Sequence, residues 1–331
     1  PSPSPRPSAT GARQRSEEIT LAAPRVTVPL TREGGFYYAD VRVNGRPYRF
    51  TLETGAWFMA GGNKVARELG FPVDTTQPVN GRVTMRAGMP MVTARIDSLT
   101  LGGVTFRGLE TRVTSLFDRG EFDGIISLAL LQDLLLTLDL GNARLVLERD
   151  SLPAANGRDV LPFAGRDPAG RIDVMMNLGG ETQPAVFDTR YADWIMTNES
   201  LAAKPRLATP LRTVGTAWGP SVGTFDMRGA RLEEAMTLGR YVLPRAPLVF
   251  RSRGSTIVGA RFLEQFAITV DQRRGRVRFT RADSVLRVPA LEWETDGAAR
   301  TAAAPARTFG FRMAARPDGR LFIIMLDTAS A

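Results

Sequence analysis

Short runs of alternating apolar and polar residues, separated by turn residues, recur along this chain of 331 residues. Alternation with a period of two predicts β-strands with one buried face. The clearest runs are LTLDLGNARLVL (136–147) and ITVDQRRGRVRF (268–279), and each predicts a β-hairpin. Only one short helix is expected before each hairpin, over LALLQDLL (128–135) and ARFLEQF (260–266). The pattern therefore predicts an all-β fold, mainly strands with a few short helices.

The same pattern occurs twice in the chain. Residues 124–149 align without gaps on residues 256–281 at a constant offset of 132, and identical pairs include Thr137 and Thr269. Further upstream, Thr100-Leu101-Gly102 recurs as Thr237-Leu238-Gly239. Several features that recur in one order at similar offsets indicate two copies of one fold unit.

Each copy also carries an acidic residue after an apolar strand. The blocks read YRFTLETGAWFM (48–59) and PAVFDTRYADWIM (184–196). The hairpin signals Asn44-Gly45 and Gly179-Gly180 stand eight positions before Glu53 and Asp188, respectively. A helix candidate follows each block, with Asn63 and Asn198 as the expected N-cap residues. The paired acidic turns are expected to face each other at a pseudo-two-fold interface.

The composition of the chain excludes several kinds of catalytic and metal site. The chain has no cysteine and no histidine, which excludes a cysteine nucleophile, a Ser-His-Asp triad and a zinc site of the usual kind. Acid–base chemistry then falls mainly to carboxylates, and no metal or cofactor is predicted. No apolar run reaches the ~18 residues that a membrane span needs.

The net charge of +9 comes mostly from scattered arginines. The densest basic stretch, RRGRVRFTR (273–281), alternates with Val277 and Phe279, so we interpret it as the solvated face of a hairpin. A functional basic surface is the alternative interpretation. No nucleic-acid partner is expected.

The two lobe-forming copies resemble the bilobal, pepsin-like aspartic peptidases and bacterial retropepsin-like sequences. In that family each lobe has a hydrophobic-Asp-Thr-Gly turn, and a hydrophobic-hydrophobic-Gly segment about seventy residues later packs behind it. Here Ile257-Val258-Gly259 matches this segment, whereas Ile125-Ile126-Ser127 has serine in place of glycine. The resemblance covers roughly residues 25–288 and implies a bilobal acid-protease fold.

The resemblance also implies a mechanism and a set of site residues. Two neighbouring carboxylates share one proton, so that one activates a water and the other protonates the substrate carbonyl. Glu53 and Asp188 are the candidate catalytic pair, and a polypeptide is the expected substrate. The candidate supporting residues are Thr54, Gly55, Thr189 and Arg190.

Two departures from the family pattern fall on this pair. Glu53 places its carboxylate roughly 1.5 Å further out than aspartate, the length of one C–C bond. Arg190 replaces the second glycine, and its guanidinium is expected to favour ionisation of both carboxylates or to form an ion pair with Glu53. Three interpretations remain open: an altered but active aspartic-type endopeptidase, an inactive pseudopeptidase that binds peptides, and a structural relic.

Two segments are expected to cover the substrate cleft. RVTMRAGMPMVTARI (82–96) predicts a flap hairpin in which Met89 lies near the tip and lines an apolar groove, with an ordinary surface hairpin as the alternative. TAWGPSVGTF (216–225) is the comparable segment of the second lobe, where Trp218 lines a subsite or fills core.

The ends of the chain differ in composition from its centre. Residues 1–24 are rich in Pro, Ser and Arg and predict a disordered tether, whereas residues 25–152 and 153–288 predict the two lobes. An Ala- and Thr-rich linker is expected over 289–304. Residues 305–331 resemble the start of a PDZ domain with a hairpin through Asp318-Gly319, and a disordered tail or a third Asp-Thr motif are the alternatives. These ends suggest a bacterial protein of the periplasm, the cell envelope or the exterior.

Overall fold

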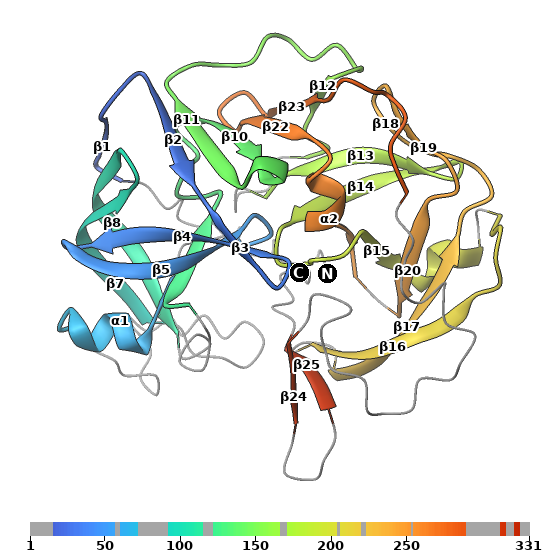
Figure 1. The fold of residues 1–331 in the computed structure, drawn as a ribbon, viewed down its shortest axis with the longest axis horizontal. Helices are drawn as coiled ribbons and strands as arrows, with labels where there is room; N and C mark the ends of the chain where they lie inside the picture. Colours follow the sequence, from blue (N-terminus) through green and yellow to red (C-terminus); the bar gives the residue numbers. More distant parts are fainter. Residues whose placement is uncertain are drawn as a thin grey trace, which may run out of the picture.

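The computed structural model describes residues 16–56, 60–71, 92–114, 122–165, 171–203, 206–219, 223–252, 254–288, 312–315 and 321–324. Within these ranges the chain consists mainly of β-strands, as predicted, with the short α-helices α1 (Asn63–Glu68) and α2 (Ala260–Leu263) (Figure 1). Short 3-10 helices, η3 (Leu140–Asn142) and η4 (Glu199–Ala203), complete the helical content of this part. No helix among the described residues is long and apolar enough to cross a membrane.

The first half of the chain forms an eight-stranded sheet. Its order is β1-β8-β6-β9-β5-β4-β3, and β7 pairs with β4 and β8. The central strand β9 runs parallel to β5 and antiparallel to β6. The strands are β1 (Glu18–Leu21), β3 (Thr31–Glu33), β4 (Phe36–Val43), β5 (Arg46–Glu53), β6 (Ala60–Gly62), β7 (Val92–Leu101), β8 (Val104–Thr114) and β9 (Gly124–Ser127).

The second half forms a nine-stranded sheet with an equivalent centre. Its order is β16-β17-β20-β15-β21-β14-β13-β18-β19, and β21 runs parallel to β14 and antiparallel to β15. The recurring Thr-Leu-Gly segments occupy matching places, since Thr100 pairs with Arg42 and Thr237 pairs with Asn177. The strands are β13 (Asp173–Leu178), β14 (Glu181–Asp188), β15 (Ile195–Asn198), β16 (Arg212–Gly219), β17 (Gly223–Arg231), β18 (Met236–Leu238), β19 (Tyr241–Leu243), β20 (Pro247–Arg251) and β21 (Thr256–Gly259).

A third sheet of six strands takes three strands from each half, in the order β12-β23-β22-β10-β11-β2 (Figure 1). At its centre, Thr137 of β10 pairs with Thr269 of β22, and their hydroxyl oxygens lie 3.0 Å apart. Because each threonine is the other's counterpart in the repeat, this pair marks an internal two-fold relation. The strands are β2 (Arg25–Pro29), β10 (Leu135–Asp139), β11 (Arg144–Glu148), β12 (Val160–Pro162), β22 (Ala267–Asp271) and β23 (Arg276–Thr280).

The predicted hairpins and turns are present. β10 pairs with β11, and β22 with β23, over the two runs that the alternating pattern singled out. Asn44-Gly45 and Gly179-Gly180 have positive φ at both positions, as a two-residue type I′ turn requires.

The basic stretch 273–281 has a structural role beyond solvation. Val277 and Phe279 are buried, as the alternation predicted. The arginines between and before them bind backbone carbonyls: Arg273 donates to Asp150 O (2.9 Å), and Arg276 donates to Leu152 O (3.1 Å). The stretch therefore anchors the chain segment that connects the two halves.

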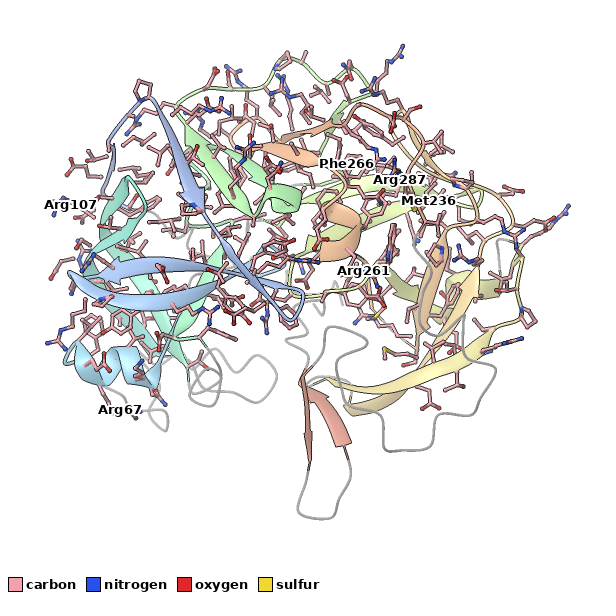
Figure 2. The ribbon with its side chains drawn as sticks, viewed as in Figure 1. Arg67, Arg107, Met236, Arg261, Phe266 and Arg287 are labelled. Carbon is pink, nitrogen blue, oxygen red and sulfur yellow. The ribbon has the colours of Figure 1, made fainter. Side chains whose placement is uncertain are left out.

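An aromatic cluster joins helix α2 to the shared sheet. Phe266 contacts Phe262 of α2 and Phe279 of β23, with ring centroids 5.6 and 5.4 Å apart, respectively (Figure 2). The rings fix α2 directly behind the strand that ends at Gly259.

Two local predictions on helices were wrong. The segment 128–135 forms turns with i→i+3 hydrogen bonds, such as Leu131 N to Leu128 O (3.0 Å), because strand β10 already begins at Leu135. Asn63 is the first residue of α1, and Gly62 occupies its N-cap position without a side-chain bond. Asn198 does cap the second helical turn, since its Oδ1 accepts the Ser200 N–H at 2.7 Å.

The tether predicted over residues 1–24 is too long. Residues 18–21 form β1, which pairs antiparallel with β8 from Glu18↔Arg107 to Leu21↔Val104. Ile19 and Leu21 are half-buried and alternate with the exposed Glu18 and Thr20. Charged neighbours concealed this short alternating run in the sequence.

Near the C-terminus, β24 (Arg312–Ala315) and β25 (Leu321–Ile324) pair antiparallel on either side of Asp318-Gly319, as expected. β25 lies beside β16 (Figure 1). The predicted linker 289–304 lies outside the described residues, and the PDZ assignment stays a prediction.

Candidate active site

The two candidate carboxylates occupy equivalent strand ends. Glu53 is the last residue of β5 and pairs with Ser127, the last residue of β9. Asp188 is the last residue of β14 and pairs with Gly259, the last residue of β21. Both are buried, with 1% of Glu53 and 4% of Asp188 exposed. The fold thus directs one carboxylate of each half toward the interface.

Reciprocal threonine hydrogen bonds join the two turns. Thr54 N–H donates to Thr189 Oγ1 (3.2 Å), and Thr189 N–H donates to Thr54 Oγ1 (3.1 Å). Each hydroxyl in turn donates across the interface: Thr54 to Phe187 O and Thr189 to Leu52 O, both at 2.7 Å. This arrangement leaves both hydroxyls with a donor and an acceptor partner, and it fixes the relative position of the acidic residues.

Gly55 is where the first turn meets the acidic residue of the second half. A Cβ atom built on Gly55 would lie 2.6 Å from Asp188 Cγ and 2.7 Å from Asp188 Oδ2. Real Cβ atoms do not approach this closely, and the atoms they would meet belong to a short, buried side chain. Glycine at this position therefore makes room for the Asp188 carboxylate.

The environment of Glu53 favours its protonated form. Burial raises the pKa of Glu53 most, the negative charge of Asp188 raises it further, and the positive charge of Arg190 lowers it; the result is a pKa of about 8. Oε2 of Glu53 has no hydrogen-bond partner within the described part of the chain. At neutral pH the pair thus retains a proton on Glu53.

Arg190 meets one of the two expectations stated for it and not the other. Its backbone N–H donates to Asp188 Oδ1 (2.8 Å), but its guanidinium forms no ion pair with Glu53. The guanidinium carbon lies 4.0 Å from the centre of the Phe36 ring and 5.0 Å from that of Phe122. Arg190 does lower the pKa of Glu53, which is the direction expected, but burial and the neighbouring carboxylate outweigh the guanidinium.

The glycine that packs behind the second turn is a steric requirement. A Cβ on Gly259 would lie 2.2 Å from Asp193 O and 2.4 Å from Tyr191 O. The first half has Ser127 at this place, and its hydroxyl is buried with no hydrogen-bond partner among the residues described. The two turns are therefore supported differently.

A buried charged group behind the second turn was missed by the sequence analysis. Arg251 is only 2% exposed, and its Nη2 donates to Ser255 O (3.1 Å). Arg261 belongs to helix α2 (Figure 2), and its Nη1 lies 3.8 Å from Oδ1 of Asp193. Burial, with Asp193 as the second cause, raises the pKa of Tyr191 well above its ordinary value, while Arg251 lowers it. The sequence offers no signal for this group beyond charged residues near the turn.

Of the two predicted cleft residues, the structure describes only the backbone of Trp218. Met89 and the tip of the predicted flap lie outside the described residues. Trp218 belongs to β16, whose backbone forms a hairpin with β17 and pairs Trp218 with Thr224.

Comparison with known proteins finds a similarity in the first half of the chain. Residues 39–139 match the family model described as aspartyl protease, and this range contains Glu53, Thr54 and Gly55. A solved structure, a retropepsin-like aspartic protease from Rickettsia conorii, is 19% identical and aligns over 39% of this chain and 90% of that chain, with a TM-score of 0.28. No curated protein matches. In its first half, the chain is thus similar to the aspartyl proteases.

Proposed function

We propose that this chain is a two-lobed aspartic-type endopeptidase that hydrolyses extended polypeptides. Residues 25–152 and 153–288 form the lobes, and the substrate lies in a cleft between them. The observation that carries the proposal is the junction of the two acidic turns: reciprocal Thr54–Thr189 hydrogen bonds hold a protonated Glu53 near Asp188. The match of residues 39–139 to the aspartyl protease family supports it.

The two carboxyl groups then have distinct roles. Asp188 accepts the N–H of Arg190, a contact suited to an ionised carboxylate, so it serves as the general base. Glu53 holds the proton and serves as the general acid. The threonine bonds position both groups before substrate binds, which lowers the cost of reaching the reactive geometry.

Hydrolysis proceeds in two steps with these groups. Asp188 takes a proton from a water molecule as its oxygen bonds to the peptide carbonyl carbon, and Glu53 gives its proton to the carbonyl oxygen. The tetrahedral intermediate collapses when its C–N bond breaks. One hydroxyl proton returns to Glu53 and the proton on Asp188 passes to the leaving nitrogen, which restores the starting protonation state and yields a carboxylic acid and an amine.

One specific observation favours a second function. The extra methylene of Glu53 and the arginine at position 190 both alter the paired turns, and displacements near 1 Å can cost about 100-fold in rate. A pseudopeptidase that binds polypeptide without cleaving it is the alternative, because the same junction and cleft serve binding alone.

Cleavage in isotopically labelled water tests the proposal. The purified chain is incubated with an unstructured protein between about pH 4 and pH 9 in H₂¹⁸O, and the products are analysed by mass spectrometry. We expect new C-termini that carry ¹⁸O, as direct attack by water requires, and no cleavage by the Asp188→Asn variant. Binding of the same protein without any cleavage, by a chain that is folded, would overturn the hydrolase assignment and favour the alternative.

A further inference from the structure

Arg190 lies beside the acidic pair in a setting made of aromatic rings. Its guanidinium stacks near Phe36 and Phe122, and Tyr38, 3% exposed, belongs to the same apolar cluster. Nη1 of Arg190 donates a weak hydrogen bond to Thr51 Oγ1 (3.4 Å). The stacking holds the guanidinium plane in one orientation and removes water from its faces.

The hydrogen-bonding capacity of this guanidinium is mostly unused. It carries five N–H donors, and the bond from Nη1 to Thr51 is its one side-chain hydrogen bond within the described part of the chain. Nε is buried and unpaired there, so the donors left for an incoming group are those of Nη1 and Nη2. No Asp or Glu there forms an ion pair with it. By contrast, Arg49 stacks on Tyr38 in a similar way, at 4.2 Å, but also forms an ion pair with Glu33 at 2.7 Å.

The position of Arg190 relates it directly to the reacting groups. Its own backbone N–H donates to Asp188 Oδ1, and its positive charge lowers the pKa of Glu53. An anion bound to this guanidinium would therefore lie close to the acidic pair. A half-buried cation with spare donors attracts an anion more strongly than an exposed one, because solvent screens it less.

We infer that Arg190 is a specificity-determining residue that binds a carboxylate of the substrate next to the cleaved bond. The planar guanidinium matches a carboxylate, which can accept two parallel N–H bonds. That carboxylate belongs either to an Asp or Glu side chain or to the C-terminus of the substrate. This inference rests on the proposed function, since it assigns the substrate class for the same site.

Binding and cleavage are measured separately, so that failure of the carboxylate site can be distinguished from failure of the proposed hydrolase function. Affinity is measured with the non-hydrolysing Asp188→Asn chain for four peptides of one sequence: internal Glu or Gln, each with a free or an amidated C-terminus. Each measurement is repeated with Arg190→Gln added. Arg240→Gln is the matched control, because Arg240 also stacks on a ring, that of Tyr241 at 5.0 Å, and its loss removes the same charge.

We expect the carboxylate-bearing peptides to bind about tenfold or more tightly than their neutral partners, a preference that Arg190→Gln removes and Arg240→Gln retains. The internal-Glu and free-C-terminus arms distinguish the two sources of the carboxylate. In the unmodified chain, kcat/KM should show the same preference, and the alkaline limit of cleavage should shift upward for acidic peptides, because a bound anion offsets the effect of Arg190 on Glu53.

Equal affinity for all four peptides, or a preference that survives in Arg190→Gln, would overturn the inference. An Arg190-dependent preference without any cleavage in the unmodified chain would support the carboxylate site and reject hydrolysis. Cleavage without any preference for acidic peptides would support hydrolysis and reject the carboxylate site.

Discussion

The hydroxyl of Thr54 donates a hydrogen bond to Phe187 O while it accepts one from the N–H of Thr189. Replacing Thr54 by valine keeps the shape but leaves both backbone groups buried and unpaired. Each such group costs about 1–3 kcal/mol, so Thr54→Val should lower the free energy of unfolding by roughly twice that amount. Chemical denaturation measures it, with Thr54→Ser as the matched control, since serine keeps the hydroxyl.

Because the junction is symmetric, the same prediction applies to Thr189. Thr189→Val should have a similar effect, because the Thr189 hydroxyl makes the same two kinds of bond. Equal stability of the valine and serine variants at either position would contradict a structural role for these hydrogen bonds.

Glu53 should make the stability of the protein depend on pH. Its pKa is about 8 when folded, against an ordinary value of 4.5, so between these values the folded chain retains a proton that the unfolded chain has lost. The free energy of unfolding should therefore fall as pH rises through this window, by on the order of a few kcal/mol, and level off above it. Denaturation at several pH values checks this.

The Glu53→Gln variant is the control for this titration. Glutamine is uncharged at every pH, so the difference in stability between the variant and the unmodified chain should change across the window. A difference that stays constant from about pH 5 to pH 8 would show that Glu53 titrates normally.

Gly55→Ala should abolish cleavage. The added Cβ would displace the Asp188 carboxylate, from which it would lie 2.6–2.7 Å away. Gly165→Ala is the matched control, because a Cβ there meets no atom within 4 Å. Cleavage of an unstructured protein is the measurement, and full activity of Gly55→Ala would contradict the close approach of the two turns.

The double variant Glu53→Asp, Arg190→Gly tests the two departures together. It restores the paired Asp-Thr-Gly turns, and we expect it to cleave neutral peptides at acid pH at least as fast as the unmodified chain. Asp188→Asn in this background should abolish the activity. A folded double variant without activity would favour the binding function.

The sequence predicted the repeat, the mainly β fold, the hairpins over 136–147 and 268–279 and the turns at Asn44-Gly45 and Gly179-Gly180, because each depends on local alternation and on spacing. The catalytic role of Glu53 and Asp188 stays a prediction. Sequence reasoning failed where tertiary contacts decide. The segment 128–135 has the composition of a helix but forms turns that lead into strand β10 at Leu135. Strand β1 forms by pairing with β8, which lies far from it in the sequence.

The net pKa shift of Glu53 could not be predicted from the residues next to it in the sequence. Arg190 lowers the pKa of Glu53, but the net shift is upward because burial and the charge of Asp188 outweigh the guanidinium, and both depend on segments far apart in the chain. The buried Arg251 escaped notice for the same reason, since arginine is rarely enclosed in this way.

The six-stranded sheet that the two halves share has a consequence for severed chains. At its centre β10 pairs antiparallel with β22, and the equivalent residues Thr137 and Thr269 face each other. Each half alone would therefore present an unpaired strand edge that is complementary to the same edge of a second copy. A chain cut between β11 and β12 should reassemble from its two pieces by strand addition, and an excess of one piece should form a homodimer through the same edge.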